Sequence, residues 1–83
     1  MMVTVKYFAG IREALECAQE QRETQATTLG ALRDELIALG GAYAQALARG
    51  KALRMACNQV MGDESTALRD GAEVAFFPPV TGG

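Results

Sequence analysis

The stretch MVTVKYF, residues 2–8, decides how the rest of the chain can fold. It is rich in β-branched and aromatic residues, and its side chains alternate between two faces with the period of a strand. Val3, Val5 and Tyr7 share the apolar face, so we expect them to point into the core. Phe8 then falls on the opposite, more polar face, where a large aromatic ring is unexpected.

A second strand of the same kind ends the folded part of the sequence at EVAFF, residues 73–77. Its alternation places Phe77 on the face opposite to the core. If the first and last strands are neighbours, Phe8 and Phe77 share a face outside the core, and an exposed aromatic pair is typical of a protein–protein contact. The alternative is that the segment around Tyr43 and Leu47 covers both rings.

One clear helix lies between these strands. Thr28 can cap its start, and Gly40 stands where a glycine commonly ends a helix. Its apolar stripe consists of Leu29, Leu32, Leu36 and Leu39. The other expected elements are a short helix in residues 11–18, a polar edge strand in 19–25, a strand over 53–61, and turns at 63–66 and 68–71. This order predicts an α+β fold, a β-grasp with a mixed sheet of about four strands and one main helix packed across it.

The bulk composition indicates one globular domain in 83 residues, with a formal net charge of −2 and 49% hydrophobic residues. The charges form no block of one sign, which argues against nucleic-acid binding, because such binding requires a clustered basic surface. No apolar run approaches the roughly 20 residues that cross a bilayer. The N-terminus lacks a signal-peptide pattern. We therefore expect a cytoplasmic protein that contacts neither nucleic acid nor membrane.

Cys17 and Cys57 form no CxxC pair, and the sequence contains no histidine. We interpret both cysteines as small, partly buried thiols in a reducing compartment. A two-cysteine metal site would need histidine partners, so we expect no metal. The lack of histidine also removes the commonest general base, which argues against independent catalysis by this chain.

The segment FFPPVTGG, residues 76–83, has the composition of a thin, stiffly attached tail. Pro78 and Pro79 cannot donate ladder hydrogen bonds, so the strand must end at Phe77. We expect a domain over residues 1–77 and a flexible tail over 78–83 that ends in Gly-Gly. The reactive group of such a tail is its terminal carboxylate, which becomes a good electrophile once it is converted to an acyl-adenylate. The simpler alternative is a frayed end with no function.

The sequence resembles the small, sulfur-carrying subunit of molybdopterin synthase, a family of ubiquitin-like β-grasp proteins. The resemblance is strongest in EVAFFPPVTGG, residues 73–83, and continues in VKYFAGIRE at 5–13, TLGALRDEL at 28–36 and CNQ at 57–59. The turn and strand DGAEVAFFPP, residues 70–79, also match the family pattern. The resemblance spans essentially the whole chain and is least diagnostic in residues 17–27 and 40–52.

The resemblance implies a substrate-protein role. An adenylating activator related to ubiquitin activators would use ATP to activate Gly83, and a sulfurtransferase would indirectly supply the sulfur of a Gly83 thiocarboxylate. Val80, Thr81 and Gly82 would form the segment inserted into the large synthase subunit, which carries the catalytic groups. There the sulfur would pass to a cyclic pyranopterin phosphate precursor and build the dithiolene of molybdopterin. The chain itself would bind no cofactor.

The resemblance also implies a heterotetramer, with two small subunits at the ends of a large-subunit dimer. Phe8 and Phe77 match the family's apolar contact surface, Met61 stands at an aliphatic contact position, and Lys51 matches a recurrent Gly-Lys position. A solvated surface lysine is an equal interpretation of Lys51. Competing functions are a sulfur carrier for thiamine thiazole synthesis or tRNA thiolation, a ubiquitin-like protein modifier, and a plain interaction domain with an incidental Gly-Gly end.

Overall fold

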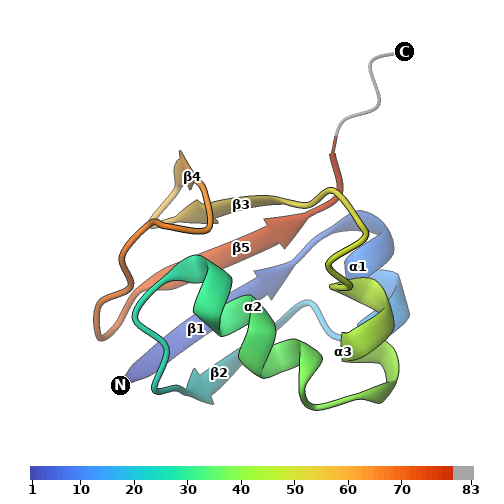
Figure 1. The fold of residues 1–83 in the computed structure, drawn as a ribbon, viewed down its shortest axis with the longest axis horizontal. Helices are drawn as coiled ribbons and strands as arrows, with labels where there is room; N and C mark the ends of the chain where they lie inside the picture. Colours follow the sequence, from blue (N-terminus) through green and yellow to red (C-terminus); the bar gives the residue numbers. More distant parts are fainter. Residues whose placement is uncertain (80–83) are drawn as a thin grey trace.

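The computed structural model describes residues 1–79, which form a five-stranded sheet and three helices (Figure 1). The strands are β1 (Met2–Tyr7), β2 (Gln19–Glu23), β3 (Arg54–Cys57), β4 (Val60–Gly62) and β5 (Glu73–Phe77). The helices are α1 (Ala9–Leu15), α2 (Leu29–Ile37) and α3 (Gly41–Ala46). The expected α+β architecture, with a mixed sheet and a main helix, is confirmed.

The sheet has the order β2-β1-β5-β3-β4, so the last strand lies at its centre. β5 pairs in parallel with β1 and antiparallel with β3, and both outer pairings are antiparallel. The predicted neighbourhood of the first and last strands is therefore confirmed, with Tyr7 opposite Phe76 in the parallel register. α2 and α3 cover one face of the sheet (Figure 1).

The core lies between that face and the helices. The side chains of Val3, Val5 and Tyr7 are buried, as the alternation in residues 2–8 predicts. They meet Val74 and Phe76 of β5 and the α2 stripe of Leu29, Leu32 and Leu36, all of which are buried in the same cluster. Full burial of each large apolar side chain contributes roughly 1.5–3 kcal/mol. The cap is also confirmed, since Thr28 Oγ1 accepts a hydrogen bond of 3.1 Å from the backbone N–H of Ala31.

The single strand expected over residues 53–61 is wrong, because this segment is a hairpin of β3 and β4. Asn58 and Gln59 connect the two strands with φ angles of 52° and 68°. Two successive residues with positive φ form the tight turn that suits a two-residue hairpin, and asparagine tolerates this region better than most residues. Asn58 is also held by β5, because its Oδ1 accepts a 3.0 Å hydrogen bond from the backbone N–H of Glu73. The sheet thereby gains its fifth strand.

The expected place of Leu39 in the apolar stripe is also wrong. α2 ends at Ile37, and the Leu39 side chain is 50% exposed. Gly40, with a φ of 78°, turns the chain into α3 instead of simply closing one long helix. α3 then carries the chain to Leu47, which is fully buried. Leu47, and not Leu39, is therefore the first leucine after α2 that belongs to the core.

A buried arginine fixes the segment that follows α3. Arg33 of α2 is 3% exposed, and its guanidinium donates to the backbone carbonyl oxygens of Leu47 at 2.8 Å, Ala48 at 2.6 Å and Lys51 at 3.0 Å. The backbone N–H of Lys51 in turn donates to Ala48 at 2.9 Å. Residues 47–51 are therefore held in one turn, although they belong to no regular element.

A carboxylate joins β1, β2 and α3 at the opposite side of the core. Tyr7 and Tyr43 both donate to Glu20 Oε2, at 2.7 and 2.6 Å. Burial and this hydrogen bond raise the pKa of Tyr7, and the hydrogen bond to Glu20 raises the pKa of Tyr43 to about 12. Partial burial raises the pKa of Glu20, but the two tyrosine hydroxyls and Arg22 outweigh it, so the net pKa lies below its ordinary value.

We predict that Arg33→Met lowers the free energy of unfolding by about 2–3 kcal/mol, because it leaves buried carbonyl oxygens without their charged donor. Urea denaturation measures this change. The matched control is Arg49→Met, since the Arg49 side chain is 42% exposed and pairs with Asp34 and Glu64 near the surface. For the control we expect at most about 1 kcal/mol. Equal effects of the two substitutions would contradict the anchoring role of Arg33.

Candidate functional site

The site lies where the central strand of the sheet ends. β5 stops at Phe77, and Pro78 and Pro79 follow directly (Figure 1). Proline has no N–H to continue the ladder, so the end of the strand is set by the sequence itself. The predicted tail residues Val80, Thr81, Gly82 and Gly83 lie outside the described residues. What the structure describes is the root from which they continue.

On one side of this root lies the helix-free face of the sheet, where the predicted aromatic pair is present. The rings of Phe8 and Phe77 meet edge to face, with centroids 6.1 Å apart. Phe8 is 44% exposed and Phe77 is half-buried. The alternative cover by residues 43–47 does not occur, because Tyr43 packs against Tyr7 and Leu47 is in the core on the other side.

Met61 lies on the same open face. The strand register places Lys6, Ala75, Ala56 and Met61 side by side across four strands, and neighbours in register share a face. Met61 is 53% exposed, which makes it available for contact. We call Phe8, Met61, Ala75 and Phe77 the open-face patch.

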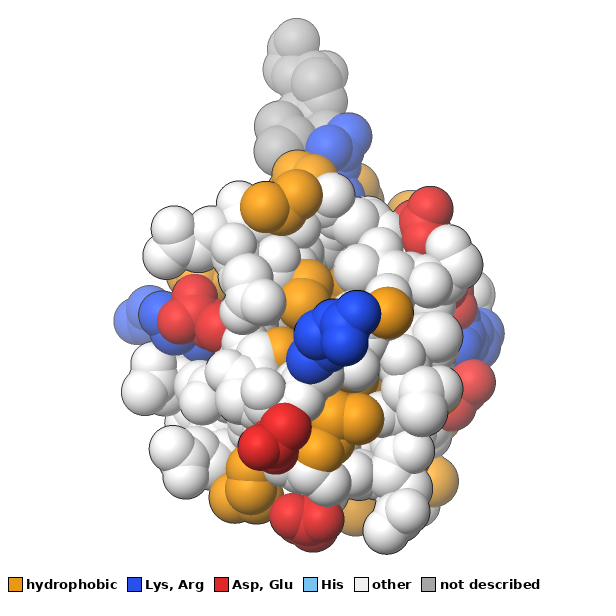
Figure 2. All heavy atoms as spheres, turned by 90° about the vertical axis from the view of Figure 1, so that its left-hand side faces the viewer, with side chains coloured by type: hydrophobic (Ala, Val, Ile, Leu, Met, Phe, Trp, Pro, Cys, Tyr) orange, Lys and Arg blue, Asp and Glu red, His pale blue; other side chains and the backbone are white. Residues whose placement is uncertain are grey.

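Charges around the patch are few and mixed. Lys6 is paired with Glu73 at 3.4 Å, and the exposed Arg54 stands opposite Phe77 in the register of β3 and β5. On another side of the molecule, the left-hand side of Figure 1, acidic and basic side chains are likewise scattered among hydrophobic ones (Figure 2). The apolar groups of the open-face patch suit recognition by apolar contact.

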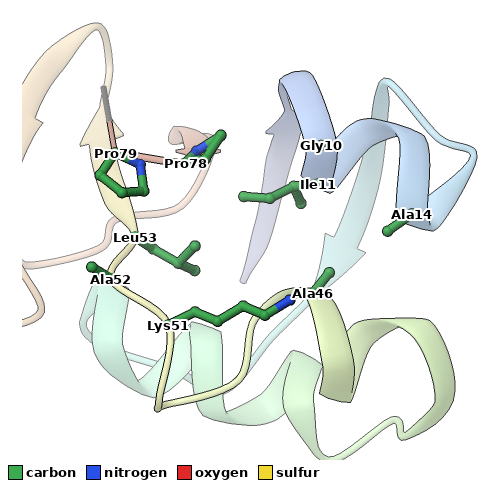
Figure 3. A pocket seen from close by; sticks show the side chains of 9 residues that line it. All are labelled: Gly10, Ile11, Ala14, Ala46, Lys51, Ala52, Leu53, Pro78 and Pro79. Atoms are coloured by element: carbon green, nitrogen blue, oxygen red, sulfur yellow. The ribbon is translucent and has the colours of Figure 1, made fainter. Parts of the chain in front are cut away.

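On the other side of the root is a cleft of about 410 Å³ (Figure 3). Its walls come from α1, from the end of α3, from the segment before β3 and from the two prolines. The lining residues are Gly10, Ile11, Ala14, Ala46, Lys51, Ala52, Leu53, Pro78 and Pro79. The structure thus brings Lys51 to the root of the tail, but on the helix side of the sheet and away from the open-face patch.

The cleft was missed by reasoning from sequence. The available signal was the pair of small residues Gly10 and Ala14, which stand four positions apart and therefore on one side of a helix. Small residues there keep α1 from filling the space beside the prolines. The predicted contact residues Phe8, Phe77 and Met61 are brought together on one face, and Lys51 is not.

Within residues 1–79, no group of three or more potential ligands is placed to hold a metal ion. Cys17 and Cys57 are free and half-buried. In the same part of the chain, no helix has the length and apolar character needed to cross a membrane.

Comparison with known proteins matches nearly the whole chain. The ThiS family matches residues 5–83. The molybdopterin synthase sulfur carrier subunits of Haemophilus influenzae and Escherichia coli are each 42% identical to this chain over 82 residues, covering 99% of it and 100% of the relative. The subunit of the same name from Mycobacterium tuberculosis is 41% identical over 83 residues, covering 98% of this chain and 96% of the relative.

Solved structures agree with the fold. SAMP1 from Haloferax volcanii superimposes with a TM-score of 0.75 at 27% identity, with full coverage of both chains. A chain in the complex of subunits 1 and 2 of molybdopterin-converting factor from Helicobacter pylori superimposes with a TM-score of 0.68 at 30% identity, again with full coverage of both. The chain belongs to the ThiS family.

Proposed function

We propose that this chain is the sulfur carrier subunit of a molybdopterin synthase. Its similarity over full length to three relatives of that name carries the proposal. In this function the Gly83 carboxylate attacks ATP, pyrophosphate leaves, and an acyl-adenylate forms on a ubiquitin-activator-like enzyme. A sulfide equivalent, which a sulfurtransferase supplies indirectly, then displaces AMP and leaves a thiocarboxylate.

The large subunit of the synthase is the proposed acceptor of the loaded tail. Val80, Thr81 and Gly82 enter its active site. There sulfur forms a bond to a carbon of a cyclic pyranopterin phosphate precursor while a carbon–oxygen bond at that carbon breaks, and the oxygen leaves with the phosphate or as water. Water then cleaves the acyl–sulfur bond and restores the carboxylate. Repetition of this transfer builds the dithiolene. The Helicobacter pylori complex of subunits 1 and 2 supports such a pairing, and we propose a heterotetramer with two carriers on a large-subunit dimer.

The described residues support a carrier more than a catalyst. A side chain that serves as general base must lie near the reacting group, and the histidine that most often does so is absent from the sequence. The open-face patch offers an apolar surface next to the tail root, which suits docking of a protein that holds the tail. We propose that the catalytic groups belong to the large subunit and that the carrier works in the cytoplasm.

A second candidate function is protein modification. SAMP1 from Haloferax volcanii, also solved as the small archaeal modifier protein 1, has the same fold at 25–27% identity. In that function a lysine amine of another protein attacks the Gly83 acyl-adenylate, the acyl–phosphate bond breaks with loss of AMP and a proton, and an amide forms. Incubation with ATP and the activator in cell extract separates the two functions, because a modifier forms covalent conjugates whereas a carrier gains sulfur only.

We predict that deletion of Gly83, or addition of one residue after it, abolishes sulfur loading. The reason is that the terminal carboxylate must reach the activator's ATP, and a tail of the wrong length misplaces it. Intact mass after incubation with ATP, activator and sulfide measures loading, and thermal unfolding checks that the fold is unchanged. Full loading of either variant would contradict the mechanism.

We predict that Phe77→Ala weakens binding to the large subunit by about tenfold or more, since it removes an aromatic anchor from the open-face patch. Titration calorimetry with the purified large subunit measures the affinity. The control is Leu39→Ala, because Leu39 is an exposed apolar residue that lies just after α2, on the helix side of the sheet. An unchanged affinity for Phe77→Ala would remove the open-face patch from the interface.

A further inference from the structure

The cleft beside Pro78 and Pro79 has fewer polar side chains than a typical small-molecule site. Pockets that bind small ligands combine apolar walls with several convergent polar groups that fix the ligand's orientation. Here eight of the nine lining residues have side chains without a donor or acceptor, and only Lys51 carries a polar group. The cleft therefore suits a side chain that is already held in place by another protein.

The charge in the cleft is single and positive. Lys51 makes no salt bridge with any residue of the described range 1–79, whereas the other lysine, Lys6, is paired with Glu73. Arg33 holds the Lys51 carbonyl, so the base of the lysine side chain is fixed. Figure 3 shows this side chain running along the cleft with its ammonium end toward Ala46. A partner carboxylate at this point would meet a positioned cation beside apolar walls.

The position of the cleft beside the root of the tail restricts which protein can bind in it. Phe77 faces the open side of the sheet, and the next two residues, Pro78 and Pro79, form a wall of the cleft. A protein whose channel encloses residues 80–83 has a mouth that surrounds the root. That mouth must therefore face both the open-face patch and the cleft, which makes the cleft continuous with the proposed interface.

We propose that the cleft is a second contact site for the large subunit, which inserts an apolar side chain between α1 and residues 51–53 and sets a neighbouring aspartate or glutamate against Lys51. This inference rests on the proposed function and adds the chemistry of the partner's contact. The large subunit would then contact the root of the tail on both sides of the sheet, at the open-face patch and at the cleft. These two contacts thereby fix the direction in which the tail enters the channel.

The experiment fills the cleft and reverses its charge in separate variants. Ala14→Phe places a ring at an exposed position of α1 that lines the cleft, and Ala42→Phe places the same ring at an exposed position of α3 outside it. Lys51→Glu reverses the cation, and Arg69→Glu makes the same charge change in the turn before β5, at the far end of that strand from Pro78. Titration calorimetry with the large subunit gives each affinity, and thermal unfolding confirms each fold.

We expect Ala14→Phe and Lys51→Glu to weaken binding by about tenfold each, and both controls to bind within about twofold of wild type. If the two cleft variants bind like wild type while Phe77→Ala weakens binding, the cleft inference is wrong and the proposed function stands. Tighter binding by the cleft variants would mean that the cleft holds this chain's own tail, and would also overturn the inference. Wild-type protein that does not bind the large subunit would overturn the proposed function itself.

Discussion

The parallel pairing of β1 with β5 is the constraint on which the rest of the structure depends. It places the first and last strands at the centre of the sheet, with Tyr7 opposite Phe76. Because parallel strands end at the same edge, the start of α1 and the two prolines become neighbours. The contacts on both sides of the tail root, the aromatic pair and the cleft, follow from this parallel pairing. Phe8 meets Phe77 on the open face, and Gly10 and Ala14 face the prolines across the cleft.

The chain that connects β1 to β5 is held in place on the helix side of the sheet. A parallel connection needs a long crossover, and here the crossover consists of α1, β2, α2, α3 and the β3–β4 hairpin. Within that crossover, Arg33 holds residues 47–51 by three backbone carbonyl oxygens, so the segment that leads into β3 is positioned without regular structure. A small domain thereby presents a positioned root, which suits the proposed entry of the tail into the large subunit's active site.

Alternation and capping rules were sufficient to predict the central strands, the main helix and the aromatic pair, because these depend on local periodicity and on one strand pairing. They failed where tertiary contacts decide. The hairpin after Cys57 requires two residues with positive φ, and Asn58-Gln59 lacks the glycine that usually signals such a turn. Leu39 continues the apolar stripe in sequence, but Leu47 occupies the core. Arg33 resembles a surface residue of a helix until its backbone partners are known, and the cleft depends on residues from four separate segments.

The measurement that tests the account most directly is the location of sulfur on the wild-type chain. The protein is incubated with ATP, a sulfide source and the activating enzyme from the same cell. Its intact mass is then measured by mass spectrometry, and fragmentation locates any mass change in the sequence. For a sulfur carrier we expect a mass gain equal to the exchange of one oxygen for sulfur, confined to Gly83. An unchanged mass with an activator shown to be active, or sulfur on Cys17 or Cys57 instead, would contradict it.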